Sequence, residues 1–343
     1  MSASNTSSTP TSSTTKRPRQ SLLPNWATEP WSPKSKAILN MALASSIHFS
    51  GYEYARAATL TLVTSERTGF SSSSIVPFAM GCVSPFSLLL LWIYSKMLDA
   101  SGPSTALRNC TLIYSILLAG CGLFLQSIDS FLIDSNSPPE QQEQELNNDS
   151  VAFFYHEISK QLLFFLFIAE NCFVQLLFSQ HWAFMSSVQT KEEAAVWFAP
   201  IAGIGSIASS GAAVTVAPLM DIVGLAGLLI AAAACMLLSA AFALQAYHIA
   251  KEHQFEPKPK QKTDANNEND NETKKKQNVL QRAIALFRRV PILGALCIEV
   301  IFSQCQTSLL NSLFVLKMKD TFPNDDERAR YTGNVSFCPL ACN

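Results

Sequence analysis

The sequence QLLFFLFIAENCFVQLLFSQHWAFM (residues 161–185), continued by SSVQTKEE and by AAVWFAPIAGIGSIASSGAA up to Ala213, decides the fold class of this chain. Its first segment has 25 residues and a single formal charge, Glu170, close to the middle. About 20 consecutive apolar residues cross the hydrocarbon core of a bilayer, so the segment is predicted to be a membrane-spanning helix. A carboxylate at that depth is costly unless it faces a polar cavity or a partner. Glu170 is therefore the first candidate for a functional residue.

The composition of the whole chain fits a membrane protein better than a soluble one. Charged residues make up 15% and hydrophobic residues 48% of the 343 residues, whereas soluble domains carry about 25% charged residues. The net charge of −1 provides no basic field for nucleic acid. The nine cysteines are scattered singly and are interpreted as small hydrophobic residues. We therefore expect no metal and no cofactor.

Apolar stretches recur along the chain and predict an all-α, polytopic membrane protein. Spans are expected at about 37–63, 74–97, 106–128, 160–185, 194–217, 222–247 and 291–316. The resulting organisation has four parts, which are a disordered Ser/Thr-rich tail (1–35), a six-helix transmembrane half (36–250), a charged cytosolic connection (251–289), and a seventh helix followed by a polar end (290–343). The tail fits a transit-like targeting segment and a plain cytosolic tail equally well.

The first span is the most polar of the set, and its polar residues are ordered. They recur at spacings of three and four, which places them in one stripe along a helix: Ser45, His48, Tyr52, Arg56 and Thr59. Glu53 lies three residues before Arg56, close enough to pair with it. The stripe favours a helix that lines a cavity, and the alternative is an amphipathic helix on the membrane surface.

Charged and small residues supply two further expectations. Lys and Arg concentrate in the N-terminal tail and in 251–289, while the loop after the third span carries six acids and neither Lys nor Arg. By the positive-inside rule, the tail and the connection face the cytosol and the acidic loop faces away. In the fifth span, small residues on neighbouring faces predict a close helix–helix approach: Ala202, Gly205, Ser206, Ser209, Ser210 and Ala213.

Three stretches resemble the plastid and bacterial-parasite ATP:ADP antiporters, a nucleotide transporter family of the major-facilitator type. They are YEYARAATLTLVT (52–64), the segment from Glu170 through SVQTKEEA to WFAPIAGIGSIASSG, and LLNSLFVLKMKDTFPNDDERARYTG (309–333). Their order matches the family over residues 37–333, about seven of its twelve helices. The resemblance implies a major-facilitator-like six-helix N-terminal bundle plus the first helix of the second half. It also implies a multi-pass location, with the plastid envelope as one candidate membrane. Because alternating access in this architecture needs two six-helix halves, we expect that the chain does not transport alone and that it is unstable, oligomerises or is part of a longer product.

The resemblance also nominates substrate-binding residues. Arg56 and Glu170 match charged positions of the family's first and fourth helices, and Tyr52 opens the first matching stretch. Thr59 stands where the family tends to have a lysine, and Asn311 where it has a glutamate. These two departures favour an altered substrate preference relative to ATP and ADP.

The expected function is nucleotide antiport by alternating access, with a nucleotide and the lipid bilayer as partners and no nucleic acid. No phosphate-cradling GxxxxGK[ST] loop is present in the sequence, which argues against ATP hydrolysis, and no nucleophile–base arrangement indicates an enzyme. Three alternatives remain. They are a transporter of another small anion, a truncated membrane protein that does not transport, and a seven-span receptor, which would need the N-terminus outside.

Overall fold

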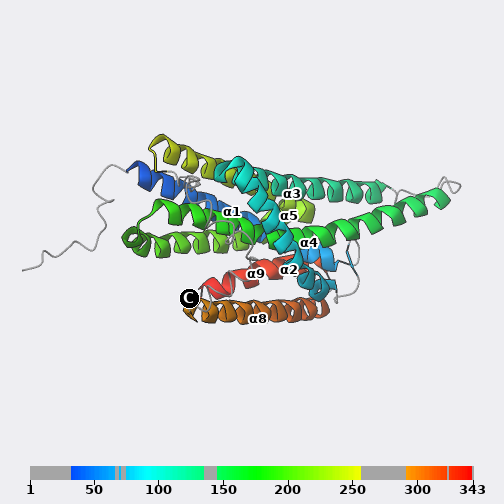
Figure 1. Ribbon diagram of the computed structural model, residues 1–343. Helices are drawn as coiled ribbons and strands as arrows, with labels where there is room; N and C mark the ends of the chain where they lie inside the picture. Colours follow the sequence, from blue (N-terminus) through cyan, green and yellow to red (C-terminus); the bar gives the residue numbers. More distant parts are fainter. Residues whose placement is uncertain are drawn as a thin grey trace, which may run out of the picture. The chain divides into compact units, whose positions relative to one another are not determined.

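The computed structural model of the chain describes residues 32–65, 69–70, 75–134, 145–255, 291–322 and 324–341. The regular structure within these ranges is helical and includes no strand, which confirms the predicted all-α class. The helices are α1 (Pro33–Thr64), α2 (Ile75–Ser101), α3 (Pro103–Asp134), α4 (Glu145–Val188), α5 (Lys191–Glu252), α8 (Pro291–Thr321) and α9 (Asp325–Ala341) (Figure 1). The predicted tail and charged connection fall, for the most part, outside the described residues.

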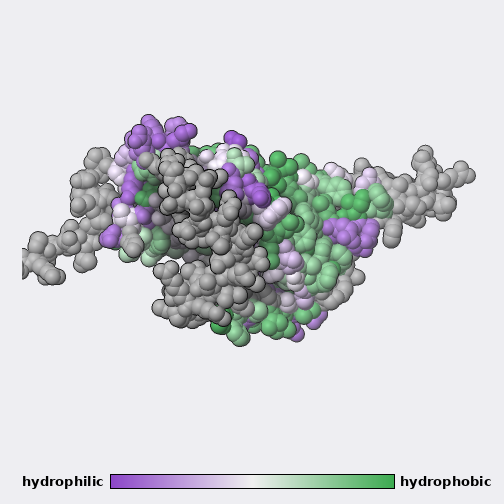
Figure 2. Space-filling view, in the orientation of Figure 1, coloured by the Kyte–Doolittle hydropathy of each residue, from purple (hydrophilic) through white to green (hydrophobic). Residues whose placement is uncertain are grey.

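Four of these helices are long and apolar enough to cross a membrane. They are α2, α3 over Pro103–Ser127, α4 over Phe154–Val188, and α5 over Glu192–Glu252. Their large apolar side chains often face outward, as Leu88 (70% exposed) and Trp92 (61% exposed) do on α2. Apolar residues accordingly cover broad areas of the face seen in Figure 2. Such a surface is suited to lipid, and these are the features of a multi-pass integral membrane protein.

The predicted six-helix, major-facilitator-like bundle with one helix of a second half is not what the structure shows. Among the described residues, neither α1 nor α8 has the length and apolarity of a membrane-spanning helix, and the helices that do are α2, α3, α4 and α5. α4 also begins at Glu145, well before the predicted start near residue 160. The reason for the difference at α1 is its environment. Its polar side chains are covered by protein, so it needs no apolar surface of its own.

α5 turns back on itself at Gly224. This residue has φ 72° and ψ 179°, outside the helical range, and its positive φ is a conformation that glycine adopts without strain. Lys34 of α1 contacts Glu193 near the start of α5, and Ala37 shares a buried cluster with Ala250 near its end. Both ends of α5 therefore lie beside the beginning of α1. The element is a hairpin of a first leg (191–223) and a second leg (225–252), close to the two predicted spans at 194–217 and 222–247.

α1 is the central helix of the described part of the chain. Of its 32 residues, 19 are buried, and it packs against α4, α9 and both legs of α5. α4 runs antiparallel to it, because Thr59 contacts Glu170 while His48 lies beside His181. A helix resting on a membrane surface would leave one face exposed, so the alternative interpretation of α1 is wrong.

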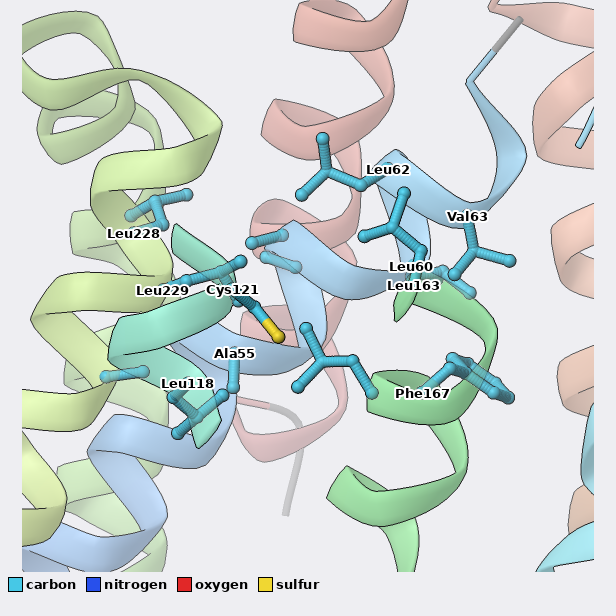
Figure 3. Close-up of a cluster of buried hydrophobic side chains, with 14 of the residues drawn as sticks. Ala55, Leu60, Leu62, Val63, Leu118, Cys121, Leu163, Phe167, Leu228 and Leu229 are labelled. Carbon is cyan, nitrogen blue, oxygen red and sulfur yellow. The ribbon is translucent and has the colours of Figure 1, made fainter. Parts of the chain in front are cut away.

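The main hydrophobic core surrounds the C-terminal half of α1. Figure 3 shows side chains of four elements meeting there. α1 contributes Ala55, Leu60, Leu62 and Val63, α3 Leu118 and Cys121, α4 Leu163 and Phe167, and α5 Leu228 and Leu229. The helices approach closely where a side chain is missing. A Cβ on Gly51 would lie 2.8 Å from Cys235 Cβ, and one on Gly122 would lie 2.9 Å from the Ala226 carbonyl oxygen.

The polar end predicted after the seventh span forms a helix, α9, which packs against α5 and α1 and also contacts α8. The rings of Phe314 and Tyr331 stack with centroids 6.1 Å apart. The helix starts with an N-cap signal, since Asn324 Oδ1 accepts from the backbone N–H of Asp326 at 3.3 Å and acidic residues fill the first turn. Arg328, only 1% exposed, donates to the Thr64 carbonyl at 3.3 Å and ties α9 to the end of α1.

Candidate functional site

The structure brings four of the five predicted site residues to one cavity. This space, here called the Arg56 cavity, has a volume of about 40 Å³ and lies among α1, α2, α4 and α8. Its lining residues are Tyr52, Arg56, Leu60, Met80, Phe167, Glu170, Asn171, Asn311, Phe314 and Val315. The volume admits a few water molecules and is far below the roughly 300–1,000 Å³ of pockets that hold a small ligand. The site is therefore closed in this structure.

Arg56 is the cation of this cavity, and the described residues offer it neither a hydrogen bond nor an ion pair. Its charge is within electrostatic range of Glu53 and Glu170. Glu53 does not form the predicted pair with it among the described ion pairs. Instead, Glu53 accepts a hydrogen bond of 2.8 Å from Ser209 in the first leg of α5. A guanidinium inside a membrane protein without a direct partner is costly, and a bound anion would remove that cost.

Glu170 is 2% exposed and is oriented by Thr59. The Thr59 hydroxyl contacts both the Glu170 carboxylate and the Ala55 carbonyl one helical turn earlier. Thr59 is fully buried and is not among the residues that line the cavity. The structure thus places Thr59 behind Glu170, and its contact with the cavity is indirect.

Asn311 reaches the site from α8, although it lies 255 positions after Arg56 in the sequence. It is half-buried, and Phe314 and Val315 of the following turn close the same side of the cavity. Tyr52 lines the opposite side from α1. The residues that the resemblance nominated from three distant stretches therefore lie together at one place in the fold.

The predicted polar stripe of α1 does not face a single space. Tyr52 and Arg56 line the Arg56 cavity, whereas His48 is fully buried elsewhere. His48 Nδ1 lies 3.2 Å from Met236 Sδ, and its ring centroid is 5.7 Å from that of His181. α4 and α5 cover different parts of the stripe, so its residues do not all face the same space.

A second, larger cavity was not predicted. This aromatic cavity has a volume of about 230 Å³ and lies among α1, α4 and the first leg of α5. It is lined by Ser45, Phe49, Phe178, Trp182, Ile201, Ala202, Gly205, Ser206 and Ser209. The small residues of α5 were interpreted as a helix–helix contact. The signal that could have found the cavity is the occurrence of large rings on two other helices opposite this small-residue face.

Neither protein-family models, nor curated proteins, nor solved structures include a match to this chain. The resemblance to the nucleotide transporters therefore stays a prediction, and the two cavities are what the structure itself contributes to a function.

Proposed function

We propose that the chain is a membrane transporter of a small organic anion, with a nucleotide as the substrate class that the sequence resemblance favours, and that it exchanges substrates by alternating access. The observation that carries the proposal is Arg56. Its guanidinium lines a buried cavity and has no direct partner among the described residues. A guanidinium presents N–H donors in a planar fork that fits phosphate and carboxylate oxygens.

Glu170 gives the site a way to exchange one anion for another. When no substrate is bound, Glu170 and Glu53 attract Arg56 through space without a direct contact. An incoming anion competes with these carboxylates for the guanidinium, and a leaving anion returns Arg56 to them. Such exchange needs no hydrolysis, in agreement with the absence of a phosphate-cradling loop from the sequence.

In the proposed scheme, a cavity as small as the Arg56 cavity corresponds to a closed conformation. Substrate entry requires α8 or α2 to move relative to α1 and α4, because these four helices enclose the space. Alternating access in transporters occurs through such movements of helix groups around a central site.

Binding to the purified chain in detergent is the first test, since it needs only the helices that line the cavity. Arg56→Ala should weaken ATP binding at least tenfold, which corresponds to about 1.4 kcal/mol, and Arg56→Lys should restore part of it. Arg108→Ala is the matched control, because Arg108 is exposed at the start of α3. Isothermal titration measures the dissociation constants.

Uptake of radiolabelled ATP into vesicles loaded with unlabelled ATP then tests exchange. Equal ATP binding by Arg56→Ala and the unaltered chain would remove Arg56 from the site and refute the proposal. Binding that is lost in Arg56→Ala, together with competition by other small anions at equal strength, would support an anion transporter and exclude a nucleotide preference.

A further inference from the structure

The aromatic cavity has no role in the exchange scheme described above. It is nearly six times the volume of the Arg56 cavity, at about 230 Å³ against 40 Å³. Three large rings face it from two helices, Phe49 from α1 and Phe178 and Trp182 from α4. The centroids of Phe49 and Phe178 are 5.5 Å apart, and Trp182 meets Phe178 edge to face at 5.9 Å. Opposite these rings, α5 supplies mainly small residues, Ala202, Gly205, Ser206 and Ser209, together with Ile201.

The cavity also contains polar groups that are free to bind. Ser45 is 5% exposed, and its hydroxyl has no hydrogen-bond partner among the described residues. The Ser206 hydroxyl also has no hydrogen-bond partner among the described residues, whereas the Ser209 hydroxyl donates to the Glu53 carboxylate. Aromatic rings, a wall of mainly small residues and two free hydroxyls together suit a planar heterocycle, which stacks on its faces and hydrogen-bonds at its edge.

The two cavities lie on the same faces of α1 and α4. Phe49 precedes Arg56 by seven residues, and Asn171 precedes Phe178 by seven. A step of seven residues returns to nearly the same side of a helix about 10 Å further along its axis. On the turns between the cavities, α1 carries Tyr52, which lines the Arg56 cavity, and α4 carries the exposed Gln175.

We propose that the aromatic cavity binds the base of a nucleotide whose phosphates reach Arg56. The inference rests on the proposed function, since it assigns the second half of the same substrate. A mononucleotide carries a planar heterocycle at one end and phosphates at the other, and its length bridges the step between the two cavities. The ribose then lies against Tyr52 and Gln175.

The test compares three probes on the purified full chain in detergent: ATP, inorganic tripolyphosphate and adenosine. Phe178→Leu removes a ring while keeping an apolar side chain, and Gly205→Val fills the cavity, since a Cβ there lies in ordinary contact 3.4 Å from Phe49. Phe165→Leu is the control for the first variant, because Phe165 is 45% exposed on the same helix. Gly203→Val is the control for the second, because no atom lies within 4 Å of a Cβ at that position of α5.

Both cavity variants should weaken ATP and adenosine binding about tenfold, the scale of one stacked base, and leave tripolyphosphate binding unchanged. The controls should bind all three probes like the unaltered chain. Unchanged ATP binding in Phe178→Leu and Gly205→Val would overturn the inference, as would loss of co-purified lipid from these variants with no change for ATP. If Arg56→Ala weakened none of the probes, the proposed function itself would fail. If it weakened ATP and tripolyphosphate while the cavity variants changed nothing, only the base subsite would fail.

Discussion

At the scale of single residues, the contact between Thr59 and Glu170 distinguishes this site from an ordinary packed helix pair. A buried carboxyl group that loses its hydrogen-bond donor retains the desolvation cost without compensation. The Thr59 hydroxyl is the described donor to Glu170. Its role is to hold the carboxylate in position toward the cavity that Arg56 lines.

Thr59→Val, which replaces the hydroxyl by a methyl group of similar size, should lower the stability of the folded protein by about 1–3 kcal/mol. Thr59→Ser, which keeps the hydroxyl, should retain most of that stability. The matched control is Thr61→Val, since Thr61 is equally buried on α1 and donates only to the Ala57 carbonyl, at 2.8 Å. That carbonyl can keep its helical hydrogen bond without the side chain. Thermal unfolding in detergent measures all three, and equal losses in Thr59→Val and Thr61→Val would contradict the assigned role.

At the scale of helices, glycine determines how closely two elements approach. In α3, Gly122 faces the second leg of α5, where a Cβ would lie 2.9 Å from the Ala226 carbonyl oxygen and 2.9 Å from Ile230 Cγ1. Gly120, two residues earlier on the same helix, has no atom within 4 Å of a Cβ position. Substituting alanine at Gly122 and at Gly120 therefore distinguishes the effect of helix packing from the effect of helix propensity.

Gly122→Ala should therefore destabilise the protein by about 1–3 kcal/mol, because the backbone of α5 must shift. Gly120→Ala should be neutral or slightly stabilising, since alanine favours a helix by up to about 1 kcal/mol over glycine. Denaturation in mixed micelles compares the two variants. A larger loss for Gly120→Ala would show that α3 and α5 pack differently from the arrangement described here.

At the scale of the whole molecule, the helix directions place the ends of the elements on two sides. The start of α1 and both ends of α5 lie together, through Lys34 and Glu193 and through the cluster that contains Ala37 and Ala250. The end of α1 lies at the other side with the start of α9, since Ser65 donates to Asp325. The prediction that the N-terminal tail and the charged connection share one face of the membrane lies outside the described residues, and it requires these helix ends to lie on that face.

Single cysteines at Glu252 and Asn324, both exposed, should accordingly react with a membrane-impermeant thiol reagent from opposite sides of sealed vesicles. The positive-inside rule further expects Glu252→Cys to react from the cytosolic side. All nine native cysteines, among them the exposed Cys305, are replaced by serine in the parent so that only the introduced cysteine reacts. Labelling of both positions from the same side would refute the alternation of helix directions.

Much of the arrangement could be predicted from local sequence. Long apolar runs specify spanning helices because the bilayer provides no partner for an open backbone, and that reasoning located α2, α3, the core of α4 and the two legs of α5. It also identified Arg56 and Glu170 as candidate site residues, since a charge within an apolar run is costly unless it faces a partner or a polar cavity. The N-cap and acidic residues that begin α9 were equally readable, but this segment was predicted only to be a polar end.

How these elements act together depends on contacts that the sequence pattern does not specify. Periodicity shows which residues share a helix face, yet it does not show which neighbour covers that face. The stripe on α1 was therefore divided by α4 and α5 into Tyr52 and Arg56 on one cavity and a buried His48 elsewhere. The position of Asn311 beside Arg56 and the space between Phe49, Phe178 and Gly205 depend on contacts between segments far apart in the chain. Such contacts arise from the packing of whole helices, which no local pattern specifies.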